Sequence, residues 1–238
     1  AGTGRMIYRG EMTVCLHIHC GDWAAKQARL APLDGDVWVW RDSPAVGPIA
    51  AVWDEHRRLR AAWWAVDPAE MQDPRALPDD RPIALWFGPD PWEQMALVEL
   101  LAGAPGTAAL SVVPLERGVG ESRPDGLPAR FERRVPAPER APLRQLWADF
   151  CADDRPALDR AVTELRGHPQ LPHLGAALAR VLAERRDRTT ALRVRALVHA
   201  GVRELPALMQ RLRALEAPKH GVWYGDSIVA RLRDAVDA

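Results

Sequence analysis

Polar residues suited to binding or proton transfer recur where three apolar segments of this sequence end. They are Gly21, Asp22, Arg41, Asp42 and Asp90, with Gln94 four residues later. A carboxylate in such a place can act as a general acid or base or bind a hydroxyl group, and an arginine can clamp a phosphate or carboxylate. A glycine lets a ligand approach the backbone closely. The pattern predicts a site for a small anionic ligand, such as a nucleotide or a phosphorylated metabolite.

Alternating strands and helices must position these residues. Apolar and β-branched runs predict strands at 13–20, 36–40, 81–87 and 108–114. Helices are expected at 23–31 with Asp22 as N-cap, at 54–66, and at 91–102 as a strongly amphipathic helix. The alternation favours parallel pairing with right-handed crossovers, a Rossmann-like α/β sheet. Ligands bind outside the carboxyl ends of such strands, where the polar residues fall.

The second half of the chain has a different residue pattern, with a proline-rich segment followed by predicted helices. Residues 114–142 are rich in proline and charge, which indicates a linker or an irregular packed segment. Helical patterns follow at 143–152, 156–166, 174–186, 190–200, 205–215 and 228–236, with a turn or short strand at 220–227. This order fits a winged-helix-like module or an irregular helical bundle. We therefore expect a Rossmann-like domain at 12–135 and a helical domain at 140–238, leaving the residues before Met12 aside.

The composition excludes several classes of protein. The 238 residues include 32 basic and 32 acidic side chains, which argues against a globally basic nucleic-acid-binding surface. No apolar run is long enough for a membrane span, and no secretion signal is recognisable. The three cysteines lack zinc-ligand spacing and are expected to be reduced, and we expect no metal site. With no secretion signal either, we expect a cytoplasmic, bacterial-type protein.

Several short motifs give a resemblance to a known family. They are His17-x-x-x-Gly21-Asp22, Trp40-Arg41-Asp42, Gly47-Pro48, Arg60, and the segments 85–97, 170–184 and 223–232. In this order they resemble the bacterial DUF1835 family, whose function is unknown, over residues 13–236. The resemblance implies the fold and the location of the site, and Asp90 and Gln94 match its pattern. Gly88-Pro89 departs from the family's acidic and histidine positions and Glu93 replaces its aspartate, which would mark an inactive or altered member if those groups are catalytic.

The resulting candidates are three catalytic residues and five ligand-binding residues. The catalytic candidates are Asp22, Asp42 and Asp90, and the binding candidates are His17, Gly21, Arg41, Arg60 and Gln94. A structural interpretation competes with this one, because aspartates are favoured helix caps and the charged residues could pair with each other. His17 could equally be a core histidine. With His19 on the same strand face it could form a metal pair, although no third ligand is evident.

Two other functions remain open from the sequence. The arginine-rich run 183–195 could contact nucleic-acid phosphates, which would make the chain a nucleic-acid-binding or regulatory adaptor acting through its C-terminal helices. The same run could be an ordinary solvated face. A protein-interaction scaffold anchored by tryptophans such as Trp53 or Trp92 is the third hypothesis. The sequence leaves the reaction, any cofactor and the oligomeric state undetermined.

Overall fold

A five-stranded sheet forms the centre of the protein in the computed structural model, which describes residues 14–220 and 225–236. The strands are β1 (Leu16–Cys20), β2 (Asp36–Trp40), β3 (Ile83–Trp86), β4 (Leu110–Val112) and β5 (Val135–Pro136). Their order is β2-β1-β3-β4-β5, with β5 antiparallel to β4 and the other pairs parallel. The predicted α/β class and the parallel pairing of the first four strands are confirmed.

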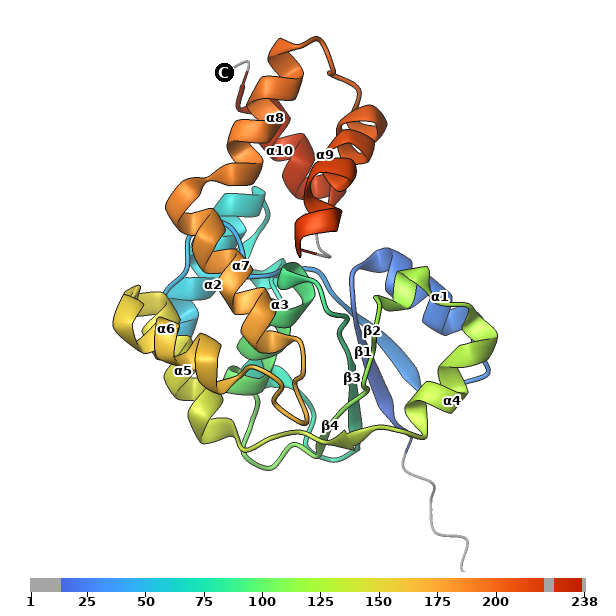
Figure 1. The fold of residues 1–238 in the computed structure, drawn as a ribbon. Coiled ribbons are helices and arrows are strands. Elements are labelled where there is room, and N and C mark those ends of the chain that lie inside the picture. Colours follow the sequence, from blue (N-terminus) through green and yellow to red (C-terminus); the bar gives the residue numbers. More distant parts are fainter. Residues whose placement is uncertain (1–13, 221–224, 237–238) are drawn as a thin grey trace, which may run out of the picture.

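Helices cover both faces of the sheet (Figure 1). On one side lie α1 (Asp22–Leu30) and α4 (Leu127–Phe131). On the other lie α2 (Trp53–Trp64), α3 (Pro91–Gly103), α5 (Arg140–Ala152), α6 (Arg155–Glu164) and α7 (Leu174–Asp187). Short 3-10 turns occur at Pro68–Glu70, Pro74–Ala76, Val119–Glu121 and Pro124–Gly126. Because both faces are covered, every residue of β1 and β3 is buried.

The last three helices form a separate layer beyond one end of the sheet (Figure 1). They are α8 (Thr189–His199), α9 (Leu205–His220) and α10 (Asp226–Asp234). Val194, Leu208 and Val229 are the centre of a small apolar core of their own. Residues 221–224, which belong to the predicted turn or strand at 220–227, lie outside the described residues, as does residue 13. None of the described helices combines the length and the apolar character that crossing a membrane requires.

Helix α3 differs from the prediction of a strongly amphipathic helix. Ten of its 13 residues are buried, because the helix lies between the sheet and the helices α5 and α7. Even Gln94 and Glu99, which are polar, are almost fully buried. The prediction of an amphipathic helix is therefore wrong, and α3 is the central helix of the main core. A helix that is apolar on nearly all sides is typical of such a position.

The proline-rich segment is packed against the protein and is not a free linker. Leu115, Val119 and Leu127 are buried in an apolar cluster that they share with Ala24 and Ala28 of α1. The segment also contains α4 and the edge strand β5, neither of which the sequence patterns predicted. Of the two interpretations of residues 114–142, the irregular packed segment is confirmed.

The main apolar core contains residues from both sides of the predicted domain boundary. Leu97 on α3 belongs to the same buried cluster as Leu143 on α5 and Leu174 on α7. The division at residues 135–140 stays a prediction. The predicted helix and strand bounds otherwise differ from the observed ones by at most five residues.

Candidate functional site

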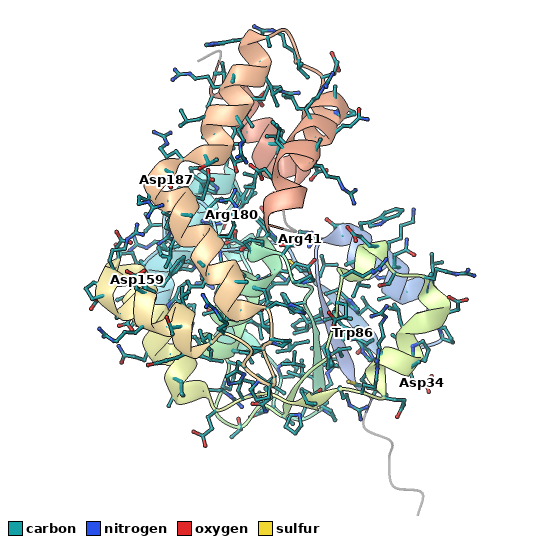
Figure 2. All side chains as sticks on the ribbon, in the orientation of Figure 1. Asp34, Arg41, Trp86, Asp159, Arg180 and Asp187 are labelled. Atoms are coloured by element: carbon teal, nitrogen blue, oxygen red, sulfur yellow. The ribbon has the colours of Figure 1, made fainter. Side chains whose placement is uncertain are left out.

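The loops that follow the parallel strands enclose a cleft of about 1230 Å³. Its lining includes Cys20 and Gly21 after β1, Arg41 after β2, Asp90 after β3 and Glu116 after β4. The first residues of α10 border it as well. Figure 2 shows Arg41 at the end of the sheet nearest the C-terminal helices, with Asp34 at the opposite end. The cleft thus lies at the carboxyl ends of the strands. After β1 the chain passes to α1 on one face of the sheet, and after β3 it passes to α3 on the other face.

Gly21 turns the chain from β1 into α1 at the edge of the cleft. Its φ of 82° and ψ of 156° suit glycine almost exclusively, and its N–H donates to the Trp40 carbonyl at 2.8 Å. A Cβ atom at Gly21 would meet nothing within 4 Å, so the space in front of this turn is open. Asp22 is the first residue of α1 and not its N-cap, which corrects the prediction. No described side chain caps this helix, so its first N–H groups are available to a ligand.

Asp22 and Arg41 form an ion pair at the mouth of the cleft. The Arg41 Nη2 and Nε atoms donate to the two Asp22 carboxylate oxygens at 2.8 and 3.2 Å. The side chains are 65% exposed for Arg41 and 71% for Asp22, so water competes for both. Gln72 accepts from the Arg41 backbone N–H at 2.9 Å and fixes the end of β2. The predicted pairing of charges at the strand ends is observed here. Because the pair is exposed, a ligand can take the place of either partner.

Asp42 points into the protein although it follows Arg41 directly. Its carboxylate accepts hydrogen bonds from the Arg60 guanidinium through Nη2 and Nε, and from the Trp64 indole at 2.8 Å. Arg60 is fully buried and also donates to the Ser43 carbonyl at 2.9 Å. Burial raises the pKa of Asp42, but the bonds and charge of Arg60 outweigh it, so the pKa is lowered overall. Arg60 does not line the cleft, and the pair ties α2 to the end of β2.

A second buried polar contact lies beside this pair. His56 on α2 and Glu99 on α3 are hydrogen-bonded, with 3.0 Å between His56 Nε2 and Glu99 Oε1. Together with Asp42 they are three possible metal ligands whose atoms lie within 4.8 Å of each other. The His56 Nδ1 atom accepts the Ala50 N–H at 3.3 Å, which leaves the ring proton on Nε2, where a metal would have to bind. Since Arg60 also holds Asp42, the arrangement fits a hydrogen-bond network better than a metal site.

Asp90 and Glu93 place two carboxyl groups at the start of α3. Asp90 accepts the Glu93 N–H at 2.9 Å and caps the helix, as the structural interpretation predicted. The Glu93 carboxylate accepts the Gly88 N–H. Burial, followed by the Asp90 charge, raises the pKa of Glu93 well above its ordinary value, and burial also raises the pKa of Asp90. Both half-buried groups line the cleft, and the closeness of Asp90 makes the Glu93 carboxyl group harder to ionise.

The loop that carries Gly88 is packed closely against its neighbour. A Cβ atom at Gly88 would lie 2.7 Å from the Gly118 Cα atom, because the loops after β3 and β4 touch there. The Gln94 side chain holds the same loop by donating to the Gly88 carbonyl at 2.7 Å. Gln94 is buried and does not line the cleft, so its place is behind the loop that carries Asp90.

His17 is a core histidine with both ring nitrogens in contact with polar atoms. The Trp86 indole donates to its Nδ1 at 3.1 Å, and Nε2 lies 3.1 Å from the Asp34 carbonyl oxygen. Burial lowers the pKa of His17 and lowers that of His19 to about 3. His19 stacks on Trp86, and its ring nitrogens have no partner among the described residues. Neither histidine lines the cleft.

Three of the five arginines of the predicted basic patch make contacts within the protein. Arg185 stacks on the Phe150 ring, with 3.7 Å between its Cζ atom and the ring centroid. Arg186 pairs with Asp187, and Arg193 pairs with Glu216 at 3.0 Å. These contacts favour the structural interpretation of the run 183–195 over a row of free phosphate-binding groups.

The sequence patterns did not find every residue of the cleft. Trp23, Trp64, Glu116, Arg117 and Glu121 also line it, and the last three lie in the proline-rich segment. For the three residues of this segment, the only signal in the sequence is that the segment follows the fourth strand. Comparisons of the chain with protein-family models, with curated protein sequences and with solved structures found no match.

Proposed function

We propose that this protein binds a small polar molecule in the cleft at the carboxyl ends of β1 to β4, and that its sheet is Rossmann-like. The observation that carries this proposal is the position of the cleft. In the strand order β2-β1-β3-β4, the strands are all parallel, but β2 is added on one side of β1 and β3 and β4 on the other. The loops after β1 and β3 therefore lie on opposite sides of a crevice. A volume of about 1230 Å³ is ample for a metabolite or a nucleotide.

Four of the predicted residues are placed to touch such a ligand. The open turn at Gly21 and the uncapped start of α1 suit an anionic group, because the helix dipole and free N–H groups favour negative charge there. Arg41 could join them by leaving Asp22, since an exposed pair is held by about 1 kcal/mol or less. Asp90 and Asp22 are the carboxylates best placed for hydroxyl contacts or proton transfer.

The other predicted residues are engaged within the protein, and of these only Asp42 reaches the cleft surface. Asp42 and Arg60 are engaged with each other, Gln94 holds the loop that carries Asp90, and His17 belongs to the core. We propose that these four position the cleft. The resemblance to DUF1835 and the bacterial, cytoplasmic origin stay predictions. The ion pairs of Arg186 and Arg193 within the protein count against the adaptor hypothesis.

Native mass spectrometry of the protein purified at low salt tests the proposal. A discrete bound mass is expected on the wild-type chain. The variant Glu116→Trp puts a large ring in the cleft from an exposed position and should remove this mass. Glu132→Trp, at an exposed residue outside the cleft, is the matched control and should keep it. A bound mass that survives Glu116→Trp would place the ligand elsewhere and refute the proposal.

A further inference from the structure

The charge of the cleft is strongly negative. Its described lining contains eight carboxylates, one of them Asp226 on α10, and two arginines. Arg60 balances Asp42 and Arg41 balances Asp22. Five more carboxylates have no ion pair among the described residues: Glu70, Asp90, Glu93, Glu116 and Glu121. Within a concave surface such a lining concentrates cations and repels anions.

Three of these carboxylates line the cleft where the loops after β3 and β4 touch at Gly88 and Gly118. Asp90 and Glu93 are adjacent at the start of α3, on the loop after β3. Glu121, in the segment after β4, also lines the cleft, and its backbone N–H donates to the Gly118 carbonyl at 3.1 Å. Its charge adds to the burial that raises the pKa of both groups. Like charges held together in this way repel each other, and a positive group placed among them would relieve the repulsion. This part of the cleft therefore favours a cation.

Indole rings lie around the same cleft. Trp23, Trp64 and Trp92 all line it. Trp23 is largely exposed, yet its ring is fixed because Nε1 donates to the Gly120 carbonyl at 2.8 Å. Trp64 and Trp92 touch edge to face, with 6.2 Å between ring centroids. Indole faces attract ammonium groups, whereas a hard metal ion uses oxygen ligands at about 2.0–2.6 Å and needs no such walls.

We propose that the ligand of the cleft is a small organic cation, with one or more protonated amino groups held between the Asp90–Glu93–Glu121 carboxylates and the tryptophan rings. This inference rests on the proposed function, because it assigns a ligand class to that same cleft. The volume admits an elongated amine or an aminated sugar with room for several contacts. An anionic part of the ligand would lie at Gly21, on the other side of the cleft.

Isothermal titration calorimetry at 150 mM salt tests the inference with named probes. Spermidine represents the organic cation, AMP and inorganic phosphate represent anions, and Mg²⁺ represents a metal ion. The test variant is the double substitution Glu93→Gln and Glu121→Gln, which keeps side-chain size and removes charge. Glu55→Gln, at an exposed residue on α2 outside the cleft, is the control. Trp23→Leu probes the ring contact.

Spermidine should bind the wild-type chain and the Glu55→Gln control equally. The double variant should weaken it by about tenfold, the usual effect of losing a charge-assisted hydrogen bond. Trp23→Leu should weaken it by about threefold, in the range of one cation–π contact. Spermidine binding that the double variant leaves unchanged would overturn the inference, because the amine would then sit elsewhere.

The remaining outcomes separate this inference from the proposed function. If AMP or phosphate binds, Glu116→Trp abolishes that binding and spermidine does not bind, then the cleft is a ligand site but the organic cation is refuted. Binding of Mg²⁺ without spermidine refutes it in the same way. If no probe binds and the purified protein carries no bound mass, the proposed function and the inference both fail.

Discussion

Arg41 and Asp42 are adjacent in the sequence, but they belong to two aspartate–arginine pairs with very different surroundings. Asp22 and Arg41 meet at the mouth of the cleft with more than half of each side chain in water. Asp42 and Arg60 meet in the interior, where their exposed fractions are 7% and 0%. Water and salt weaken the first pair, while removal of either partner from the second leaves a charge buried without compensation.

The difference shows how one segment can serve both the fold and a site. At the end of a strand, successive side chains point to opposite sides, so Arg41 turns outward and Asp42 inward. The inward pair joins β2 to α2 and stiffens the floor of the cleft. The outward pair leaves an arginine and a carboxylate that a ligand can recruit at little cost in stability. We expect substitutions at the two pairs to have separate effects on folding and on binding.

The largest expected effect is that of Arg60→Met. The methionine keeps most of the apolar stem but removes the donors that Asp42 needs, so we expect the free energy of unfolding to fall by about 3–5 kcal/mol. Urea denaturation followed by far-ultraviolet circular dichroism measures this. A loss below about 1 kcal/mol would mean that the interior pair is no more important for stability than the exposed pair.

Gly21→Ala should have the next largest effect. Its φ and ψ values are accessible to few residues other than glycine, so the substitution should cost about 1–3 kcal/mol. A Cβ atom there has no neighbour within 4 Å, and the cost is therefore one of backbone conformation alone. Gly126→Ala is the control, because its φ of −87° is ordinary and its Cβ atom would also meet nothing. Equal stability of the two variants in thermal denaturation would contradict the strained turn.

The pH dependence of Glu93→Gln should distinguish the cleft from the interior. Burial and then the Asp90 charge raise the pKa of Glu93, so the folded protein binds more protons than the unfolded chain above pH of about 4.3. Stability of the wild type therefore falls as the pH rises from there to the raised folded pKa. The variant should lack this fall and be more stable than the wild type at neutral pH, with no difference below pH of about 4. Chemical denaturation at several pH values measures it, and a pH-independent difference would contradict the raised pKa.

Asp42 should show the opposite behaviour. Its pKa is lowered because Arg60 outweighs the effect of burial, so its contribution is fully present above the pKa of the unfolded chain, about 3.9. That contribution is lost only as the pH falls through the lower folded value. In Arg60→Met this acid-induced loss should disappear, and its persistence would show that another carboxylate causes it.

Arg41→Ala should have the smallest effect on stability. Both partners are largely exposed, so we expect the free energy of unfolding to change by less than about 1 kcal/mol. Differential scanning calorimetry against Arg60→Met makes the comparison direct. A large drop in melting temperature would support the structural ion-pair interpretation and remove Arg41 from the list of ligand contacts.

The sequence predicts the order of the elements well where hydrophobic runs and glycine turns are clear. The strands ending at Cys20 and Trp40 are examples, since each is followed by a polar turn. The pattern predicted the helix α3 but not its burial, because a helix surrounded by sheet and helices has apolar residues on all sides. It also missed β5, which is only two residues long and contains a proline at the edge of the sheet.

The site was predictable in location and less so in the direction of its side chains. Gly21, Asp22, Arg41 and Asp90 line the cleft as the strand ends suggested. The inward turn of Asp42 toward Arg60 depends on how α2 packs against the sheet, which no local pattern contains. The acidic residues Glu116 and Glu121 reach the cleft through long-range packing of an irregular segment, and charge counting along the sequence does not place them.

The most direct test of a ligand site at the strand ends is a crystal structure of the wild-type protein soaked with spermidine, beside one soaked with AMP. We predict spermidine density between the Trp23 ring and the carboxylates of Asp90 and Glu93, with Asp42 and Arg60 still paired below it. Density for neither probe in the cleft, in crystals whose packing leaves the cleft open, would contradict the proposed site. Density for AMP alone, over Gly21 and Arg41, would keep the site and contradict the cationic ligand.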